Sequence, residues 1–245
     1  MKKYYVTQSC KKFTPILNIF YKNLKLLDFF DGLVVYTDDN KFSPSDSFIK
    51  VIHGKDISYS DNLKIAVKSC SEDCFFCGCD DYIFYKDHFK VKEISKIWDY
   101  FCNRQDIGIL RLNKAKCESK TFNKELSILE VPKSYKYSVN LQPCMWKKIF
   151  FNSINQTKLN AWDFEHRLTS AAKKSKYICC CTETNLSPLI NGNKNGDAYR
   201  CDFVDLVESI DPSFDFSKST IYVKRNGIKK NISYNEYIKN GRFLL

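Results

Sequence analysis

Apolar and polar residues alternate in blocks along the first half of the chain, and each apolar block predicts one secondary-structure element. Short runs rich in β-branched and aromatic residues predict strands at 3–9, 31–37, 48–54, 73–79 and 106–113. The run at 73–79 is apolar at nearly every position, which is typical of a strand covered on both faces, as in a parallel sheet. It ends at two adjacent aspartates, Asp80 and Asp81.

The segments between these strands have the period of helices. Thr14 followed by Pro15 predicts a capped helix start, and Ser60 or Asp61 is expected to cap a second helix. In a third segment, apolar residues three and four positions apart mark one face of an amphipathic helix: Ile94, Ile97, Trp98 and Phe101.

The second half is less regular. We predict a strand at 137–143, a helix at 144–154, a helix capped by Asn160, and a strand at 177–181. A loop rich in Asn and Gly is expected at 182–197, and Asn226-Gly227 between two β-type segments predicts a hairpin near the C-terminus.

Strands that alternate with helices of this length predict an α/β fold, a mostly parallel mixed sheet flanked by helices, with the C-terminal hairpin added. In such sheets ligands bind beyond the carboxyl ends of the strands. Asp38 and Asp39, His53, and the pair Asp80 and Asp81 all follow strand candidates at those ends. The fold therefore predicts a site at that edge.

Composition is compatible with a folded chain: 245 residues, 44% of them hydrophobic, are enough for a large core. We find no apolar run long enough to span a membrane and no signal peptide, so we expect a soluble, cytoplasmic protein without a transmembrane segment. The 12 cysteines lie mainly in apolar runs, which favours reduced thiols packed as small hydrophobic residues over a disulfide scaffold.

The formal charge is +11, and only six of the 39 basic residues are Arg. Because the lysines are spread along the chain, a solvated basic surface explains the charge as well as contact with phosphates or nucleic acid does. Arg111 lies at the end of the fifth strand, where it could pair with a phosphate or with an acidic neighbour.

Two carboxylates at the edge of a sheet offer the hard oxygen ligands that Mg²⁺ or Mn²⁺ prefers, with positions left open for phosphate oxygens. A metal bound by Asp80 and Asp81 would neutralise a diphosphate leaving group. The alternative is an ordinary acidic turn after a strand.

Four short motifs add to this pair, and they occur in a consistent order. They are Ser60-Asp61-Asn62-Leu63, Cys79-Asp80-Asp81-Tyr82, Leu141-Gln142-Pro143-Cys144-Met145-Trp146 and Trp162-Asp163-Phe164-Glu165. Together with the first strand, over residues 4–168, this pattern resembles glycosyltransferases of the GT-A fold found among polysaccharide and glycan biosynthesis genes. The sequence departs from the family pattern at Cys79, where another apolar residue is usual, and at Asp163, where Glu is usual.

The resemblance implies a single GT-A-like domain over 1–245, in which 1–115 bind a nucleotide sugar and 116–245 bind the acceptor and include a C-terminal extension. It implies a divalent metal, Mn²⁺ or Mg²⁺, with Asp81 as its ligand and Asp80 touching the metal, the ribose or the sugar. Further donor-binding residues are expected at or just after the carboxyl ends of the strands: Thr7, Gln8, Ser9, Asp38, Asp39, His53 and Arg111.

The acceptor, a glycan or glycoconjugate, is expected to meet the second half. An inverting transfer needs a carboxylate that removes the proton of the attacking hydroxyl, and Glu165 or Asp163 is the candidate base. Trp146 and Trp162 are candidate faces for sugar stacking, and Gln142 is a candidate hydrogen-bond partner for sugar hydroxyls.

Three other functions are compatible with parts of the sequence. Cys70, Cys74, Cys77 and Cys79 are close enough to suggest a zinc module, although no second Cys/His pair follows at a suitable distance. Basic and aromatic residues are common in nucleic-acid-binding proteins, yet no binding motif is present and we expect no nucleic-acid partner. A catalytically inactive protein of the glycosyltransferase type is the third alternative.

Overall fold

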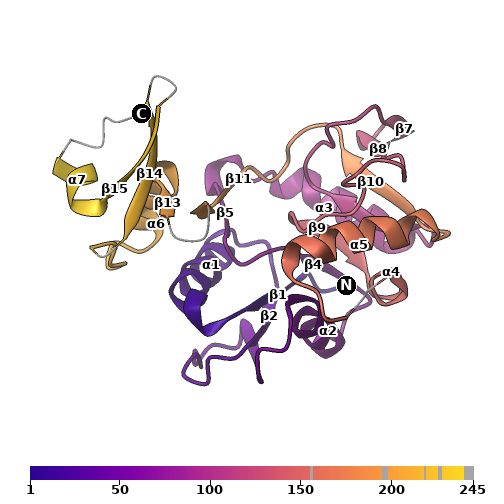
Figure 1. The fold of residues 1–245 in the computed structure, drawn as a ribbon. Helices are drawn as coiled ribbons and strands as arrows, with labels where there is room; N and C mark the ends of the chain where they lie inside the picture. The colour runs from indigo at the N-terminus through magenta and orange to yellow at the C-terminus, as the bar shows by residue number, and fades with distance from the viewer. Residues whose placement is uncertain (155–156, 195–197, 218, 226–227, 240–245) are drawn as a thin grey trace.

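The computed structural model describes residues 1–154, 157–194, 198–217, 219–225 and 228–239, and its centre is a nine-stranded sheet (Figure 1). The strand order is β3-β2-β1-β4-β9-β6-β10-β8-β7. Their bounds are β1 (Tyr4–Ser9), β2 (Gly32–Thr37), β3 (Ile49–His53), β4 (Cys74–Cys77), β6 (Ile107–Arg111), β7 (Lys120–Asn123), β8 (Ile128–Glu130), β9 (Cys144–Lys147) and β10 (Ile178–Thr182). Strands β9 and β8 run against the others, so the sheet is mixed but mostly parallel, as predicted.

Helices cover both faces of this sheet. Helices α1 (Thr14–Leu26), α3 (Val91–Asn103) and α6 (Cys201–Ile210) belong to the core on one face, and α2 (Tyr59–Ser69), α4 (Lys148–Ile154) and α5 (Ala161–Lys173) to the core on the other. Successive strand residues alternate between the two cores, because side chains of a strand point to opposite faces. In β10, Cys180 faces one core while Cys179 and Cys181 face the other, so these three thiols do not converge.

The elements of the first half match the sequence patterns, with small shifts at two helix starts. Helix α1 already begins at Thr14, whose hydroxyl donates to Asp39 Oδ2 at 2.7 Å instead of capping the helix. The N-cap of α2 is Ser58, whose Oγ accepts from Asp61 N at 3.1 Å, and not Ser60 or Asp61. The Asn160 cap of α5 is confirmed.

The largest correction concerns residues 137–154. No strand forms at 137–143, and the predicted helix at 144–154 divides into strand β9 and helix α4. Strand β9 lies between β4 and β6, where both of its faces are buried, and tertiary pairing therefore overrides the helical spacing of Trp146 and Phe150. The predicted loop at 182–197 also includes two short strands, β11 (Leu189–Asn191) and β12 (Asn193–Lys194).

A separate four-stranded sheet follows at the C-terminal side, in the order β12-β13-β14-β15 (Figure 1). Its further elements are β13 (Ala198–Arg200), β14 (Thr220–Arg225), β15 (Ile228–Ser233) and α7 (Tyr234–Lys239). Strands β14 and β15 pair antiparallel, which confirms the predicted hairpin, while Asn226 and Gly227 lie outside the described residues.

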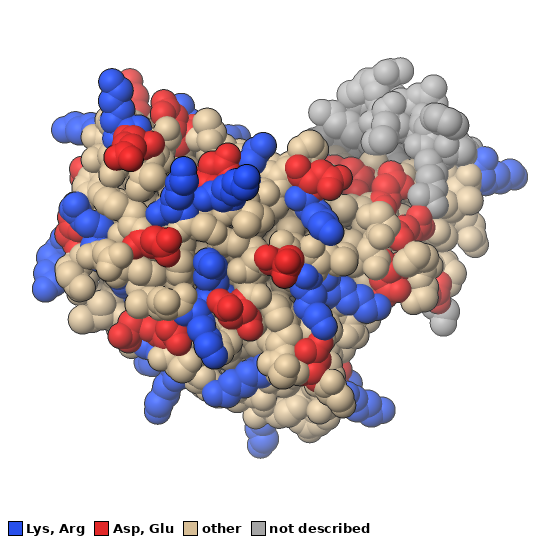
Figure 2. All heavy atoms as spheres, turned by 180° about the vertical axis from the view of Figure 1, so that it is seen from behind, with Lys and Arg blue, Asp and Glu red and all other residues tan. Residues whose placement is uncertain are grey.

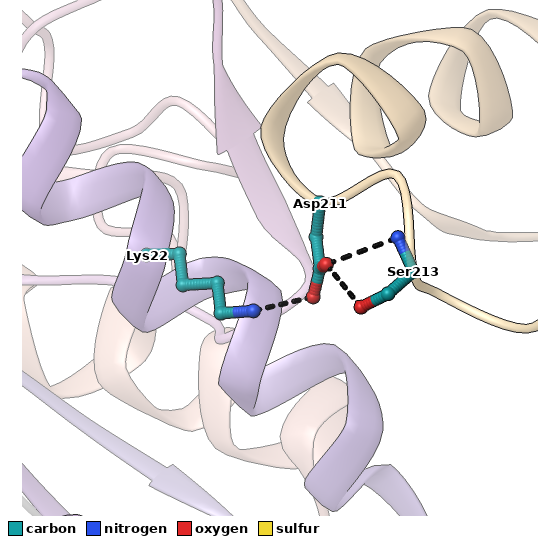
Figure 3. Close-up of polar contacts among 3 residues, drawn as sticks. All are labelled: Lys22, Asp211 and Ser213. Atoms are coloured by element: carbon teal, nitrogen blue, oxygen red, sulfur yellow. Dashed lines mark hydrogen bonds and ion pairs between the residues drawn. The ribbon is translucent and has the colours of Figure 1, made fainter.

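Helix α6 and the turn after it connect this small sheet to α1. Lys22 Nζ lies 2.5 Å from Asp211 Oδ2, and Asp211 Oδ1 accepts from the Ser213 hydroxyl at 2.6 Å (Figure 3). Because the Lys22 side chain is 46% exposed, this ion pair contributes little to stability by itself. The apolar contacts of Phe203, Val204 and Val207 with the core of α1 carry the attachment.

Two short strands, β5 (Tyr82–Phe84) and β11, form an antiparallel pair outside the main sheet, and one buried side chain of α1 holds this pair in place. Asn23, 2% exposed, donates to Phe84 O at 3.0 Å and accepts from Phe84 N at 2.8 Å. Since β5 directly follows Asp80 and Asp81, Asn23 fixes the chain immediately after the acidic pair.

We expect Asn23→Ala to lower the free energy of unfolding by roughly 2–4 kcal/mol, because it leaves a buried N–H and a buried C=O without partners. Urea denaturation measures this loss. The matched control is Asn103→Ala, which removes an exposed amide that donates to Asp99 O, and it should change stability by no more than about 0.5 kcal/mol. Equal effects of the two variants would show that the Asn23 bonds do not hold β5.

Within the described residues, no helix has both the length and the apolar character needed to span a membrane.

Candidate functional site

A cavity of about 820 Å³ opens at the carboxyl ends of β1 and β4. Its walls come from distant parts of the sequence: residues 8–10 at the end of β1, 56–59 before and in α2, 79–82 after β4, and 158–162 and 165 at the start of α5. Parallel strands deliver their carboxyl ends to one edge, and a switch in strand order at that edge leaves room for a ligand. The cavity is therefore where the fold predicted a site.

The acidic pair lies in this cavity and is placed there by a tight turn after β4. Gly78, just before this turn, is closely packed: an added Cβ would lie 2.3 Å from the hydroxyl of the buried Tyr5. The Thr7 hydroxyl donates to Gly78 O at 2.8 Å and ties this turn to β1. Asp80 and Asp81 both line the cavity, although Asp80 is only 9% exposed.

Few neighbouring groups stabilise the negative charge of the buried Asp80 carboxylate. Burial, and to a smaller extent the Asp81 carboxylate, raises its pKa to about 7, while the nearby Ser9 hydroxyl opposes the rise. Ser9 does not reach full hydrogen-bond geometry: Asp80 Oδ2 and Ser9 Oγ are both buried without a partner among the described residues. An uncompensated carboxylate oxygen in a cavity is a binding element for a cation.

The residues present fit a divalent metal whose remaining coordination positions are filled by the substrate. Mg²⁺ and Mn²⁺ are commonly bound by one or two carboxylates plus phosphate oxygens, and Asp80 and Asp81 supply two carboxylates on one side. Within the described ranges, no three His, Cys, Asp or Glu side chains gather closely enough to hold a metal ion by themselves. The four cysteines considered for zinc are among the residues that form no such group.

The opposite wall is the first turns of α5. Asn160 Oδ1 accepts from Asp163 N at 2.9 Å, and its amide donates to Asp163 Oδ2 at 2.7 Å, so Asp163 is used in capping the helix. Trp162, with 78% of its surface exposed, and Glu165 line the cavity. Of the two predicted acids, the structure brings Glu165 to the cavity.

Glu165 is partly buried and held in one orientation. Its Oε1 accepts from Leu141 N at 2.8 Å. Burial raises its pKa, and the bond from Leu141 opposes the rise. The Leu-Gln segment of the third motif thus acts through its backbone: it orients the Glu165 carboxylate.

The predicted donor residues divide between two hollows. Gln8 and Ser9 line the main cavity, whereas Asp38 and His53 line a neighbouring hollow of about 490 Å³. Asp56 lines both, so the two hollows adjoin. Thr7 and Asp39 line neither hollow: Thr7 is fully buried, and Asp39 accepts from Lys41 N at 3.0 Å as well as from Thr14.

Three further predicted residues are not among those that line either hollow. Arg111 is 5% exposed and donates to Tyr137 O at 3.0 Å and to Gln142 Oε1 at 3.3 Å. These bonds hold the irregular segment before β9. Trp146 is 1% exposed and stacks on Phe150 in the core. The structure therefore places Arg111, Gln142 and Trp146 in a supporting position, behind the cavity wall.

Sequence reasoning missed Lys158, the one Lys or Arg among the described residues that line the main cavity. Its backbone, at φ 59°, donates to Asp61 Oδ2 at 2.9 Å. The adjoining Leu159 N donates to Ser60 Oγ at 3.0 Å, and Asn62 donates to Asp56 Oδ1 at 2.7 Å. The polar residues of the first motif thus hold two cavity loops, and only this long-range pairing brings Lys158 to the site.

Comparison with solved structures gives the fold. A mannosyltransferase from Pyrobaculum calidifontis, in complex with GDP-Man and Mn²⁺, matches with a TM-score of 0.53 and 12% identity, over 80% of this chain and 58% of that one. The chain has a GT-A, Rossmann-like fold. The S. aureus protein TarS in complex with UDP-GlcNAc matches with a TM-score of 0.49 and 14% identity, over 88% of this chain and 68% of that one.

Glucosyl-3-phosphoglycerate synthase from Mycobacterium tuberculosis also matches, with a TM-score of 0.49 and 11% identity, over 95% of this chain and 87% of that one. No protein-family model matches the sequence, and no curated protein matches it. The chain spans just over half of the mannosyltransferase, so the likeness concerns the shared fold.

The raised pKa of Asp80 predicts that the folded protein loses stability as pH rises. As pH rises from about 4 to about 7, the unfolded chain loses its Asp80 proton before the folded chain does, so folding is progressively disfavoured. In metal-free buffer, the difference in free energy of unfolding between Asp80→Asn and wild type should therefore shift in favour of the variant from pH 5 to pH 8, by up to about 3 kcal/mol. Thermal and urea denaturation at both pH values measure the gain.

Asp39→Asn is the matched control. The Thr14 hydroxyl and Lys41 N lower the pKa of Asp39, so this carboxylate stabilises the fold once ionised. Its replacement should destabilise the protein, with no gain at pH 8. A constant difference between Asp80→Asn and wild type across this pH range would contradict the burial of an uncompensated charge at Asp80.

Proposed function

We propose that this protein is a metal-dependent glycosyltransferase that moves a sugar from a nucleotide diphosphate sugar to a glycan or glycoconjugate. The observation that carries the proposal is the composition of the cavity: an acidic pair with an unpartnered oxygen on one wall and an oriented glutamate beside an exposed tryptophan on the other. In this proposal residues 1–115 bind the donor, and 116–245 bind the acceptor and include the C-terminal extension.

The donor diphosphate would lie against the acidic pair. Asp81 and Asp80 would hold Mn²⁺ or Mg²⁺, which when bound neutralises the negative charge of the departing diphosphate. Lys158 would add a second positive charge from the α5 side. The bond from its backbone N–H to Asp61 fixes the residue there. The mannosyltransferase of similar fold was solved with GDP-Man and Mn²⁺, which supports this choice of ligands.

The nucleoside would extend toward the adjoining hollow. Asp38 and His53 line that hollow and present hydrogen-bonding groups for a ribose or base, and Gln8 lies in the main cavity. Asp56, on the wall shared by both hollows, is fixed by the Asn62 amide at 2.7 Å. The donor would thus span the carboxyl ends of β1, β2 and β3, as ligands of open parallel sheets do.

Glu165 is our candidate for the catalytic base of an inverting transfer. A hydroxyl that attacks an anomeric carbon must lose its proton as the new bond forms, and a carboxylate within reach accelerates this step. Burial raises the pKa of Glu165, which strengthens it as a base, while Leu141 N holds one oxygen and fixes the carboxylate in place. Trp162 presents an exposed ring at the same wall, suited to stacking on an acceptor sugar.

Donor binding is tested on Asp81. In a thermal-shift screen of nucleotide sugars, wild type should gain several degrees with a cognate donor plus Mn²⁺ and less with the donor alone, because a ligand of the folded state stabilises it. Asp81→Ala should lose the Mn²⁺-dependent part. Asp163→Ala, on the same wall as Glu165 but engaged in helix capping, should keep it. A wild type that no nucleotide sugar shifts would sink the proposal.

The role of Glu165 is tested by separating binding from transfer. We expect Glu165→Gln to keep the Mn²⁺-dependent thermal shift and to lose transfer by about 10²–10⁴-fold, the usual contribution of a general base. Radiolabelled donor and a panel of glycan acceptors provide the assay, with Asp163→Asn as control. Donor binding without transfer by wild type to any acceptor would favour the inactive alternative instead.

A further inference from the structure

Residues 137–142, which we call the bridge, connect the two walls of the main cavity, and one residue of the bridge bonds to both walls. Leu141 N donates to Glu165 Oε1 at 2.8 Å on the α5 side. Leu141 O accepts from the N–H of Cys79 at 3.3 Å, and Cys79 directly precedes the acidic pair. A shift of the bridge would therefore move the glutamate relative to the two aspartates.

The bridge lies outside the helices and strands, so side chains of other elements must hold it. Arg111, at the end of β6, donates from Nη1 to Tyr137 O at 3.0 Å and from Nη2 to Gln142 Oε1 at 3.3 Å. The middle is tied to α5, where the Thr169 hydroxyl donates to Val139 O at 2.9 Å. A guanidinium presents its N–H groups as a rigid fork, so one side chain fixes both ends of the bridge.

The positive charge of Arg111 is buried and has no counterion among the described residues. Arg111 is 5% exposed, no described Asp or Glu forms an ion pair with it, and its Nε has no partner in the same part of the chain. On the surface, by contrast, Lys and Arg side chains lie among those of Asp and Glu (Figure 2). Solvent and salt screen a buried charge less than a surface charge, so it acts over a longer distance.

Glu165 is the acid on which this charge acts. Among the described acids with a shifted pKa, it is the one for which Arg111 contributes to the shift. Burial raises the pKa of Glu165, and the bond from the bridge, the neighbouring His166 and Arg111 lower it. Tyr82 from β5 and Cys144 from β9 also interact with this carboxylate, and neither is a cation. Of the two basic neighbours, Arg111 alone stays charged throughout the neutral pH range.

We propose that Arg111 is a positioning residue for Glu165: it holds the bridge and thereby sets the place of this carboxylate relative to the acidic pair. The inference rests on the proposed role of Glu165 as the base of sugar transfer. Arg111 does not line the cavity and acts through other groups. Its two bonds fix the geometry, and its charge favours the ionised carboxylate, which is the form that accepts the proton of the attacking hydroxyl.

Two substitutions of Arg111 separate the bonds from the charge. Arg111→Lys keeps a cation but loses the fork, so kcat for transfer should fall about ten- to hundredfold, with the KM of the donor and the acid limb of the pH profile nearly unchanged. In Arg111→Met kcat should fall and the acid limb should also move to higher pH, because loss of the cation raises the pKa of Glu165.

Arg104→Met is the matched control. It removes an arginine near the amino end of the same strand, where the guanidinium pairs with Asp106 at the surface. Because this arginine contacts neither the bridge nor the cavity, kcat and the acid limb should stay as in wild type.

A titration without substrate separates this inference from the proposed function. Carboxyl NMR of protein labelled with ¹³C-glutamate, with the signal of Glu165 assigned by its absence in Glu165→Gln, should give a higher pKa in Arg111→Met than in wild type. In Arg111→Lys and Arg104→Met the pKa of Glu165 should stay close to that of wild type. If the pKa moves as expected while wild type transfers no sugar, the proposed function fails and the coupling of Arg111 to Glu165 stands.

An unchanged pKa of Glu165 in Arg111→Met, or an unchanged kcat in both Arg111 variants, would overturn the inference. Should Arg111→Met fail to fold, as judged by circular dichroism, Gln142→Leu takes its place, because it removes the bond at one end of the bridge and leaves the charge. It should lower kcat with the acid limb in place. An unchanged kcat in both Gln142→Leu and Arg111→Lys would equally overturn the inference.

Discussion

Coverage of the central sheet on both faces is the constraint from which the rest of the molecule follows. Because helices cover both faces of this sheet, the side chains within its strands are mostly apolar and belong to one of the two cores. Polar groups that are to meet a ligand are confined to the strand ends. The acidic pair and the loop residue Asp56, which is fixed by Asn62, lie at such ends.

The acids of the protein separate into two kinds by their surroundings. Asp39, Asp46, Asp106 and Asp211 each have a lowered pKa, because hydroxyls, backbone N–H groups or cations bond to them. Asp80 and Glu165 have a raised pKa, and both line the main cavity. The first four acids are stabilised in their charged form by these neighbours, whereas an oxygen of Asp80 has no partner among the described residues and Glu165 has only partial compensation from Leu141 N.

The sequence was enough to predict those strands and helices whose local residue pattern matches the position that they take in the folded protein. The strands of the first half and the helix after Asn160 are of this kind, and so is the placement of Asp80 and Asp81 at a carboxyl edge. It failed where long-range pairing decides: β9 has a helical spacing but inserts between two strands. Lys158 was not predicted for the same reason, because its position depends on bonds to α2 residues about 100 positions earlier.

The contact between Asn23 and Phe84 bears on which positions of the chain are free to change. The amide of Asn23 binds only backbone atoms of Phe84, as a neighbouring strand would. The location of β5 is therefore insensitive to which side chain stands at that position, provided that it packs. The residue that fixes this strand lies in a helix about 60 residues earlier in the sequence. Substitutions in β5 that preserve its packing therefore need not move the acidic pair, whereas a substitution of Asn23 would.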